Sequence, residues 1–323
     1  MKHGMQTEST LHSGRRGEVR TDQVDISVVL VSYNSRDFLE KCFTSLYSAQ
    51  LAATFETILV DNGSTDDTVR FVASAFPQVS IIRSGMNRGF AAASNEGIRA
   101  GSGRYVLLLN CDTVVNGPSI DAMVEFLDEN CHAAAAGGIL LNQDGSFQSG
   151  ASRFSSLLQE LLIASHLGAV VLRGYPSYRV PRRPTEVDWL SAACLLVRRD
   201  VFPKVGYLDE QYFMYSEEVD WQFRFRQLGM KVYFLPHVST IHCGGSGRDR
   251  WSVRKMVYRG KILFYKKNYG RVKELVLRCL LASVTLAKLL LWGVLRLCAW
   301  NSMRPAKELR SNAEVLAICL RPC

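Results

Sequence analysis

The chain of 323 residues lacks the glycine-rich segments that bind phosphates in two common classes of nucleotide-binding enzyme. It contains no GxGxxG and no GxxxxGK[ST], which excludes a Rossmann dehydrogenase and a P-loop enzyme. It also lacks CxxC pairs, so its nine cysteines indicate reduced thiols in the cytosol. Residues 1–24 lack an apolar run of about 7 to 15 residues, and we expect a disordered polar arm there rather than a secretory signal.

Acidic residues are scarce in one part of the chain only. Residues 248–323 hold 17 Lys and Arg but 4 Asp and Glu, whereas residues 1–247 hold 22 and 26. The net charge of +9 therefore comes from the C-terminal quarter, and the rest of the chain is mildly acidic. This asymmetry favours an anionic surface as a partner, and we expect no specific nucleic-acid binding.

Apolar runs alternate with amphipathic stretches through the first half of the chain, which predicts a doubly wound α/β unit with a mainly parallel sheet. The predicted strands are 26–31, 55–60, 79–83 and 105–109, and the predicted helices are 36–49, a stretch from Asp66 with Thr65 as its N-cap, and 91–100. In the second half we predict strands at 188–197 and 231–235 and helices at 217–228 and 250–268. Binding groups in such sheets lie beyond the carboxyl ends of the strands.

The stretch Cys279–Leu295 is almost wholly apolar, with Lys288 near its middle. A membrane-spanning helix needs about 20 apolar residues, so this stretch is slightly short and interrupted. On a helical wheel Arg271, Arg278 and Arg296 share one face, beside a broad apolar face. This pattern favours a basic amphipathic helix at a membrane interface. A single membrane span and a helix packed on the catalytic domain are the alternatives.

Three polar residues, Asp61, Asp112 and His242, come after predicted strands, so we expect them at the carboxyl edge of the sheet. Asp61 can accept a hydrogen bond from a base or ribose, although DNGS is also a common turn composition. Asp112 can hold a divalent cation against a diphosphate, although Asx residues also cap helices. His242 precedes the glycine-rich segment 244–247, which allows a charged ligand to approach closely, although a lone loop histidine is more often solvated.

An acidic cluster opens the predicted helix 217–228. Glu217, Glu218 and Asp220 either stabilise the helix N-terminus through its dipole or supply a general base. Two neighbouring carboxylates raise the pKa of one of them toward the working range of a base. Spacing alone leaves both interpretations open.

A series of segments between residues 26 and 247 carries a resemblance to a known family. In chain order they are VSYNS, VDNGSTDDT, GMNRGFAAASNEGI, LLLNCDT, WLSAACLLVRRDVF, VGYLDEQYFMYSEEVDWQFRFRQLG and the His242 loop. The series resembles family 2 glycosyltransferases of the GT-A fold, in particular the rhamnosyltransferase-like bacterial members. The resemblance implies a Rossmann-like GT-A catalytic domain over residues 25–247, followed by a basic, apolar helical region over 248–323.

The resemblance also implies a role for each matching residue. Positions that bind the nucleotide sugar are matched by Ser32, Tyr33, Asn34, Asp61, Asn87, Arg88 and Asn110, those that bind metal by Asp112 and His242, and the acceptor side by Trp189. Glu218 stands at the aspartate of the family's ED pair and is the implied base, with Glu217 and Asp220 as rivals. Cys111 replaces the small or proline residue of the family's NPD motif and leaves the ligand position intact.

The implied reaction is an inverting transfer of a sugar from a nucleotide-diphosphate donor, assisted by Mg²⁺ or Mn²⁺. L-Rhamnose from dTDP-rhamnose is the donor that the resemblance suggests, with UDP- and GDP-linked sugars also open. The implied acceptor is a polyprenyl-diphosphate-linked sugar or a cell-surface polysaccharide at the cytoplasmic face of the cell membrane. The alternatives are a sugar-nucleotide pyrophosphorylase, a catalytically silent nucleotide-sugar-binding membrane scaffold and a nucleic-acid-binding module.

Overall fold

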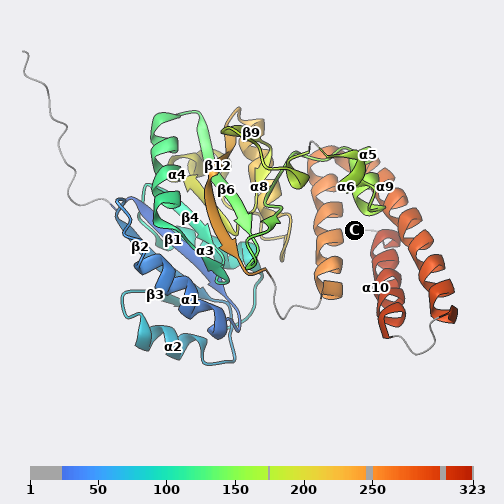
Figure 1. Cartoon of the computed structure of the whole chain (residues 1–323), viewed down its shortest axis with the longest axis horizontal. Coiled ribbons are helices and arrows are strands. Elements are labelled where there is room, and N and C mark those ends of the chain that lie inside the picture. The colour runs from blue at the N-terminus through green and yellow to red at the C-terminus, as the bar shows by residue number, and fades with distance from the viewer. Residues whose placement is uncertain (1–23, 174, 245–249, 299–302, 322–323) are drawn as a thin grey trace, which may run out of the picture.

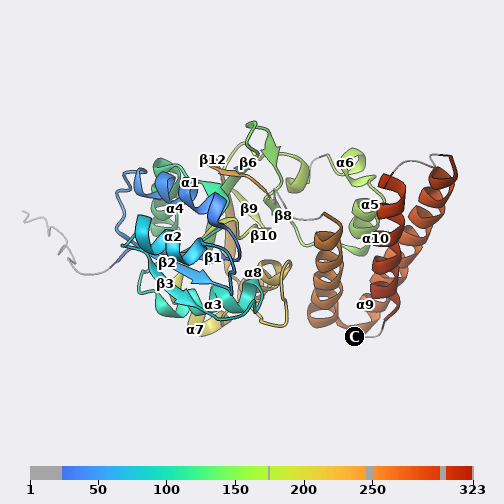
Figure 2. The same ribbon diagram turned by 90° about the horizontal axis from the view of Figure 1, so that it is seen from below.

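The structure is a computed structural model that describes residues 24–173, 175–244, 250–298 and 303–321. A mixed sheet carries helices on both faces, and a group of helices lies beside it at the C-terminal end of the chain (Figures 1 and 2). The predicted N-terminal arm lies outside the described residues except for Val24, and so does most of the glycine-rich segment 244–247.

Twelve strands occur in the described part of the chain. They are β1 (Ile26–Ser32), β2 (Phe55–Asp61), β3 (Ser80–Arg83), β4 (Tyr105–Leu109), β5 (Thr113–Val114), β6 (Ala133–Leu141), β7 (Phe147–Gln148), β8 (Ala151–Ser152), β9 (Thr185–Val187), β10 (Trp189–Leu190), β11 (Cys194–Arg198) and β12 (Lys231–His242). The main sheet has the order β3-β2-β1-β4-β11-β6-β12-β5, with β7 on β6 and β9 on β12. The first four strands are parallel, and β11 lies antiparallel between β4 and β6.

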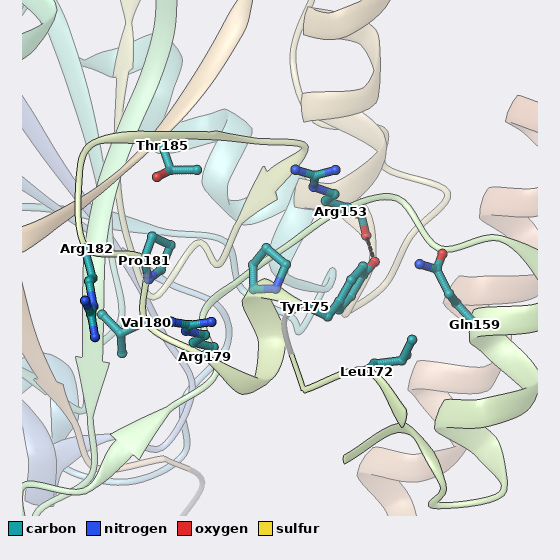
Figure 3. A pocket seen from close by; sticks show the side chains of 10 residues that line it. Arg153, Gln159, Leu172, Tyr175, Arg179, Val180, Pro181, Arg182 and Thr185 are labelled. Carbon is teal, nitrogen blue, oxygen red and sulfur yellow. Dashed lines mark hydrogen bonds between the residues drawn. The ribbon is translucent and has the colours of Figure 1, made fainter. Parts of the chain in front are cut away.

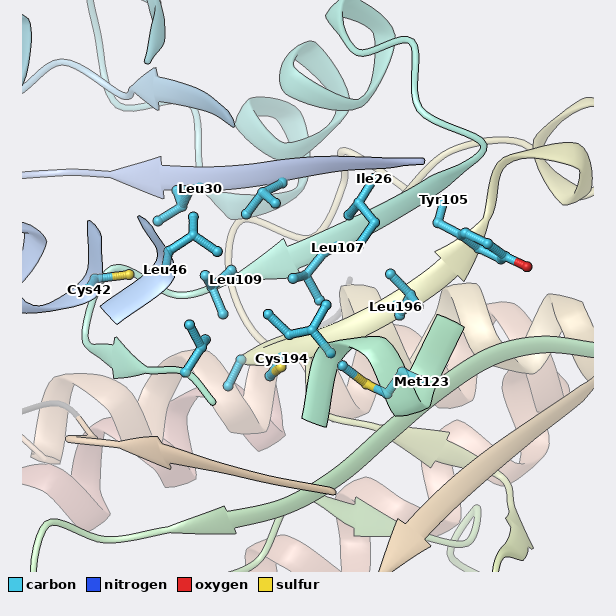
Figure 4. Packing of buried hydrophobic residues seen from close by; sticks show 14 of the residues in the cluster. Ile26, Leu30, Cys42, Leu46, Tyr105, Leu107, Leu109, Met123, Cys194 and Leu196 are labelled. Carbon is cyan, nitrogen blue, oxygen red and sulfur yellow. The ribbon is translucent and has the colours of Figure 1, made fainter. Parts of the chain in front are cut away.

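The helices cover both faces of this sheet. They are α1 (Arg36–Tyr47), α2 (Thr68–Ala75), α3 (Phe90–Ala100), α4 (Gly117–Glu129), α5 (Leu157–Ala164), α6 (Gly168–Val171), α7 (Phe202–Val205), α8 (Glu217–Gln227), α9 (Arg250–Cys298) and α10 (Met303–Leu320), with 3-10 turns η1 (Pro176–Tyr178) and η2 (Arg199–Val201). Successive side chains of β1 point to opposite faces. Val28 and Leu30 join the core under α1 and α4 (Figure 4), whereas Val29 joins the core under α3 and α8.

The strands and helices predicted between residues 26 and 109 all form, apart from the start of α2, whereas β5, α4 and β6 were not predicted. Helix α2 begins at Thr68, whereas the sequence predicted a start at Asp66 with Thr65 as N-cap. The side-chain oxygen of Asn34 accepts hydrogen bonds from the backbone N–H groups of Thr65 and Asp66 at 2.8 and 3.3 Å. Those two residues are therefore held in a loop that connects the ends of β1 and β2.

The predicted strand 188–197 is wrong as a single element, because it is divided between two sheets. The Gln222 side chain accepts from the Leu190 N–H and donates to the Leu190 carbonyl, at 2.8 and 2.7 Å, and β10 pairs with β8. The chain resumes as β11 on β4. The predicted strand 231–235 is also too short, since β12 continues to His242 after a register shift between Leu235 and Ser239.

The C-terminal helices differ from the prediction in length and in packing. The helix predicted at 250–268 continues to Cys298 as α9, with a kink at Gly270, where φ is 84°. Its first part packs on the rest of the chain: the Tyr265 hydroxyl donates to the Ser155 carbonyl at 2.6 Å, and the Asn268 amide donates to Asp220 at 2.8 Å. These contacts belong to the part of α9 before Gly270, and the alternatives for residues 279–295 stay predictions.

The predicted cationic face of the C-terminal helix is wrong at Arg278. This side chain is buried, pairs with Glu274 at 2.8 Å, and donates to backbone carbonyls at the end of α10, among them those of Ile318 and Arg321. A wheel drawn for one helix cannot show which of its faces a neighbouring helix will cover. Beyond the kink, α9 is long and apolar enough to cross a membrane by length and composition, with a mean hydropathy of 1.9.

Large apolar side chains remain exposed along α9. We call this set the apolar face of α9: Val272, Leu275, Val276, Leu286, Leu290, Leu291, Val294, Leu295 and Leu297. Of the apolar 18-residue stretch of α9 that has this hydropathy, only 22% is buried inside the molecule. Exposure of a contiguous apolar surface of this kind is typical of a surface that contacts a membrane or a partner.

Candidate active site

The topology gathers most of the predicted site residues at one edge of the sheet. Ser32 and Asp61 are neighbours in register at the carboxyl ends of β1 and β2, and Asn110 directly follows the parallel strand β4. The antiparallel pairing of β5 with β12 places Thr113 opposite His242. Asp112 is therefore beside the end of β12, where its carbonyl accepts a hydrogen bond from the Cys243 N–H at 2.8 Å.

Asp112 and His242, which are 130 residues apart in the sequence, are brought together here. The Asp112 carboxylate oxygen Oδ1 lies 3.3 Å from His242 Nε2, and the Asn110 amide nitrogen lies 3.1 Å from the same ring atom. On the other side of the ring, Nδ1 lies 2.6 Å from Oε1 of Gln148. The Gln148 amide nitrogen donates to Asn142 at 2.9 Å, which fixes its oxygen toward the histidine.

This arrangement suits a divalent cation. The Gln148 oxygen accepts the proton of Nδ1, so a neutral His242 ring has its lone pair on Nε2, on the side of the Asp112 carboxylate. Oxygen and imidazole ligands both suit Mg²⁺ or Mn²⁺. Among the described residues no group of three or more His, Cys, Asp and Glu side chains is placed to hold a metal. The remaining ligands would come from substrate oxygens and water, as is usual for Mg²⁺.

The loops after β1 and β2 hold one another in place. Asn34 has a φ of 51°, and its side chain accepts from the loop that follows β2, while its own N–H donates to Ser64 Oγ at 2.9 Å. The Asp61 carboxylate is buried at the end of β2 and accepts from the Ser64 N–H at 3.3 Å. Ser32 Oγ is buried without a hydrogen-bond partner in the described structure, and Tyr33 is exposed.

Asn62 connects the loop after β2 to the loop after β3. This residue is not identified from the sequence, because the segment DNGS is interpreted there as a turn. Its amide nitrogen donates to Asn87 Oδ1 at 3.1 Å, and its oxygen accepts from the Arg88 N–H at 2.9 Å. The Arg88 side chain points instead to surface carboxylates, 3.7 Å from Glu96 and 3.9 Å from Glu210. Asn87 is therefore tied to the strand ends, whereas the Arg88 guanidinium shares two acidic partners.

Glu217 and Glu218 form the first turn of α8, and both carry a buried carboxylate oxygen, Oε2, that has no hydrogen-bond partner in the described structure. Burial raises the pKa of both carboxyls, and the charge of Glu218 raises the pKa of Glu217 further. Ionisation of one carboxyl therefore disfavours ionisation of the other. Buried carboxyl groups without partners are costly in folding terms and are found mainly where chemistry needs them.

Asp220, the third acidic residue of α8, makes hydrogen bonds that stabilise the fold. It accepts hydrogen bonds from Arg224 at 3.1 Å, from Asn268 at 2.8 Å and from the Tyr212 hydroxyl at 3.2 Å. Its partners come from α8, from α9 and from the loop before α8. These contacts favour a structural role for Asp220 over that of a base.

The turn that precedes the two glutamates is conformationally strained. Tyr215 and Ser216 have φ values of 69° and 75°, in the left-handed region that side chains with a Cβ rarely adopt. The turn is in close contact with α9, since a Cβ added at Gly260 would lie 2.5 Å from the Tyr215 carbonyl oxygen and 2.8 Å from Ser216 Oγ. The position of the acidic pair therefore depends on a helix from the C-terminal part of the chain.

Trp189 and α8 are connected through the segment before β11. Trp189 is half-buried in β10, opposite Ser152 of β8. The next residue, Leu190, is bound on both sides by Gln222 of α8, whose amide nitrogen also lies 2.9 Å from the Glu218 carbonyl. Three residues further on, the Ala193 carbonyl accepts from the Asn110 N–H at 3.0 Å. The hydrogen bonds of Gln222 and Asn110, together with the short segment 190–193 between them, thus connect the first turn of α8 to the end of β4.

Comparison with known proteins decides the class to which this site belongs. The profile of the family described as "Glycosyl transferase family 2" matches residues 27–206. The chain belongs to this family. It is 32% identical over 246 residues to an N-acetylglucosaminyl-diphospho-decaprenol L-rhamnosyltransferase of Mycobacterium tuberculosis, which covers 69% of this chain and 78% of the relative.

More distant relatives of this family 2 glycosyltransferase cover similar shares of it. A low-salt glycan biosynthesis hexosyltransferase, Agl10, of Haloferax volcanii is 24% identical and covers 82% of this chain and 85% of the relative. The rhamnosyltransferase WbbL of Escherichia coli is 21% identical and covers 67% and 83%. The protein is a glycosyltransferase, as the sequence predicted, and the pyrophosphorylase, scaffold and nucleic-acid alternatives gain no support.

Solved structures agree on the GT-A fold of this glycosyltransferase. The mannosyltransferase PcManGT of Pyrobaculum calidifontis, solved with GDP-Man and Mn²⁺, superposes with a TM-score of 0.56 at 14% identity and covers 93% of this chain and 87% of that one. GalNAc-T7, solved with UDP, GalNAc and Mn²⁺, superposes with a TM-score of 0.55 at 16% identity and covers 77% and 50%. The predicted fold class is confirmed.

Proposed function

We propose that this glycosyltransferase moves a sugar from a nucleotide-diphosphate donor to a hydroxyl of a lipid-linked or surface glycan, with inversion at the anomeric carbon. The observation that carries the proposal is the pairing of two features. Asp112 and His242 meet at the carboxyl edge of the sheet, and a buried acidic pair, Glu217 and Glu218, is joined to that edge through Gln222. The first suits a diphosphate with its cation, and the second suits a proton acceptor.

The donor that we propose is dTDP-rhamnose, and the acceptor is a sugar on a polyprenyl diphosphate. Support comes from the relatives, because two of them are named as rhamnosyltransferases and one of these names includes a decaprenol diphosphate acceptor. UDP- and GDP-linked sugars are the competing donors. We place Ser32, Tyr33, Asn34, Asp61, Asn87, Arg88 and Asn110 around the donor and Trp189 on the acceptor side.

The proton of the acceptor hydroxyl passes to the Glu218 carboxylate in the proposed reaction. The acceptor oxygen then forms a bond to the anomeric carbon while the bond from that carbon to the donor phosphate oxygen breaks. The nucleoside diphosphate leaves with the electron pair of the broken bond. We favour Glu218 over Glu217, because more of the Glu218 residue is exposed and because it stands at the aspartate of the family's ED pair. A base whose pKa is raised toward neutrality takes up a proton more readily.

Asp112 and His242 would hold Mg²⁺ or Mn²⁺ against the diphosphate, where the ion neutralises the negative charge that develops on the leaving group. Gln148 orients the His242 ring for this task through its contact with Nδ1. The Asn110 amide, which lies 3.1 Å from Nε2, would move off that atom when the ion binds. Asp61 accepts from the sugar or the base of the nucleotide. Asn34 and Asn62 keep the loops after β1 and β2 in place.

We further propose that the protein works at the cytoplasmic face of the cell membrane. The exposed apolar face of α9 supports contact with lipid, and the basic character of residues 248–323 supports contact with anionic headgroups. Peripheral association is the form that we favour, with a single span of α9 as the alternative. A lipid-linked acceptor would then be presented at the surface to which the enzyme is attached.

A binding screen tests the proposal. The purified protein is titrated with dTDP-rhamnose, UDP-linked and GDP-linked sugars, each with Mg²⁺, with Mn²⁺ and with a chelator. We expect cation-dependent binding of one donor that Asp112→Ala weakens at least tenfold and that Asp37→Ala, at an exposed position of α1, leaves unchanged. Failure of every nucleotide sugar to bind with either cation would contradict the proposed function.

A further inference from the structure

A pocket with a volume of about 500 Å³ lies apart from the strand ends, near α5 and the turn η1 (Figure 3). Residues from five places in the chain form it: the residue after β8, α5, the end of α6, the turn η1 and the segment that leads into β9. Its lining residues are Arg153, Gln159, Leu172, Tyr175, Pro176, Arg179, Val180, Pro181, Arg182 and Thr185. None of the site roles described above involves these residues.

The lining of this pocket is cationic. Arg153, Arg179 and Arg182 are exposed, and none of the three has a carboxylate partner among the described residues. No Asp or Glu occurs between residues 161 and 185, a stretch that contains four arginines. The acids nearest in sequence are paired with other cations: Glu160 with Lys261 at 2.6 Å, Glu186 with Lys231 at 2.9 Å and Asp188 with Arg226 at 3.1 Å. The pocket therefore carries positive charge that no side chain of the described structure neutralises.

The walls of the pocket are held by hydrogen bonds. The Tyr175 hydroxyl donates to the carbonyl of Arg153 (Figure 3). Ser177 Oγ lies 2.7 Å from Ser152 Oγ, which fixes η1 on β8. The Gln159 side chain accepts from the Ser156 N–H at 2.8 Å in a capping box at the start of α5. A site with preformed walls loses less conformational entropy when it binds a ligand.

Exposed apolar side chains surround one side of this cationic pocket. Leu158 of α5 and Leu167, Val170 and Val171 at α6 are more than half exposed, and Leu172, which follows them, lines the pocket itself. α5 in turn packs on α9 through the ion pair of Glu160 with Lys261. Charge and apolar surface thus adjoin on the part of the molecule that carries the proposed membrane contact. This combination suits an amphiphile whose anionic group is attached to a hydrocarbon chain.

The pocket is connected to the acceptor side of the proposed active site. Arg153 directly follows β8, whose Ser152 lies opposite Trp189 in the two-stranded sheet. Leu190, the neighbour of Trp189, is bound by Gln222 of α8, one turn from Glu218. A ligand in the pocket would therefore lie on the side of α8 from which we expect the acceptor to approach.

We propose that this pocket binds the diphosphate of the prenyl-diphosphate-linked acceptor, with the apolar residues of α5 and α6 in contact with the prenyl chain. Arginine guanidinium groups bind phosphate oxygens in pairs of hydrogen bonds, which favours arginine at such sites. The inference rests on the proposed function in its choice of acceptor, and it adds the site at which the lipid carrier is recognised.

Binding of farnesyl diphosphate to the full-length protein in detergent tests this inference without any donor. We expect the double variant Arg179→Gln and Arg182→Gln to bind farnesyl diphosphate at least tenfold more weakly than the wild type. The matched control is Arg173→Gln and Arg183→Gln, which removes two charges from exposed neighbours that do not line the pocket, and its affinity should be unchanged. Equal losses in both variants would overturn the inference, because general electrostatic attraction would then explain them.

Further arms of the experiment separate the sources of an anionic group. Farnesol should bind at least tenfold more weakly than farnesyl diphosphate, and the difference should shrink in the pocket variant. If dTDP displaces farnesyl diphosphate competitively, the ligand sits in the donor site and the inference is wrong. If the pocket variant loses binding to phosphatidylglycerol vesicles but keeps farnesyl diphosphate affinity, the arginines contact bulk lipid and the inference is equally wrong.

Transfer kinetics provide a second readout that separates this inference from the proposed function. With a prenyl-diphosphate-linked sugar as acceptor, the pocket variant should show an acceptor KM at least tenfold higher with donor KM unchanged. An unchanged acceptor KM alongside normal transfer would overturn the inference and leave the proposed function intact. If the wild type bound no nucleotide sugar, the proposed function would be contradicted. The farnesyl diphosphate titration would still test the pocket in that case.

Discussion

The two parts of this glycosyltransferase differ in where they place charge and apolar surface. The sheet-containing part, within residues 24–244, buries its apolar residues on both faces of the sheet and gathers polar side chains at one edge. The helical part, residues 250–298 and 303–321, is strongly basic and leaves the apolar face of α9 exposed. Burial of the core residues stabilises the fold, whereas no side chain of the described residues covers the apolar face of α9.

We propose catalysis for the sheet-containing part and membrane contact for the helical part, and the two parts contact each other near the acidic pair. The acidic pair of α8 belongs to the sheet-containing part, yet Gly260 of α9 is in contact with the strained turn before it, and Asn268 of α9 binds Asp220. The turn before the proposed base is thus in contact with the same helix that carries the apolar face. The following experiments test each side of this comparison separately.

The largest expected effect is on the sheet-containing part alone. Glu218→Gln removes the proposed proton acceptor, and kcat should fall by about 10²- to 10⁴-fold, the range for loss of a general base. Donor affinity and vesicle binding should stay at their wild-type values. Glu217→Gln serves as the comparison, with a smaller loss of kcat. If Glu217→Gln proved the more damaging of the two, the assignment of the base would have to be reversed.

A second variant acts on the helical part alone. Leu286→Glu, Leu290→Glu and Val294→Glu together place three charges on the apolar face of α9, at positions one turn apart. Burying a large apolar side chain is worth about 1.5 to 3 kcal/mol, so partition onto anionic vesicles should fall by more than tenfold. The control Ala73→Glu, Ser74→Glu and Ala75→Glu adds the same charge to exposed residues of α2. Equal losses in variant and control would mean that net charge, and not the apolar face, drives the partition.

Much of the sheet-containing part could be predicted from the sequence, because its signals are local. Continuous apolar runs identified β1, β2 and β4, and the short polar segments after them placed Asp61 and Asp112 at the strand ends. The order of motifs gave the family, which is confirmed. The roles assigned to the individual site residues stay predictions, although the contact between Asp112 and His242 is what those roles require.

The remainder depended on contacts between residues far apart in the sequence. Gln148 lies in a two-residue strand with no pattern of its own, and only the fold places its amide on the His242 ring. The division of 188–197 into β10 and β11 requires Gln222 from another helix. Arg278 had the spacing of an exposed stripe, yet α10 covers it, and no signal within α9 could reveal that.

A smaller effect concerns stability and pH. The folded state raises the pKa of Glu217, so the folded protein holds this proton more tightly than the unfolded chain does. The stabilising effect is complete below the ordinary glutamate pKa of about 4.3 and is lost as the pH rises through the folded-state value. Glu217→Gln cannot ionise, and its free energy of unfolding should therefore exceed that of the wild type by about 1 to 3 kcal/mol at pH 8 and equal it near pH 4. A pH-independent difference, measured by urea titration at both values, would contradict the burial of an ionisable pair.

The smallest expected effect tests the contact between the two parts with one substitution at two sites of α9. Alanine is favoured over glycine within helices by about 1 kcal/mol, so Gly293→Ala, with open space around it, should raise the melting temperature slightly. At Gly260 the new methyl group would press on the Tyr215 carbonyl, and Gly260→Ala should lower both the melting temperature and kcat. Identical shifts at the two positions would show that α9 does not constrain the turn before Glu218.

The most direct test of the central claim compares two acceptors with the same sugar: one on a polyprenyl diphosphate in anionic vesicles and one on a short, water-soluble diphosphate. We predict that the Leu286→Glu, Leu290→Glu and Val294→Glu variant transfers sugar to the soluble acceptor at the wild-type rate but loses at least tenfold in transfer to the vesicle-bound acceptor. If the variant kept the wild-type rate on both acceptors, or lost the same factor on both, the division between a catalytic sheet-containing part and a membrane-contacting helical part would be contradicted.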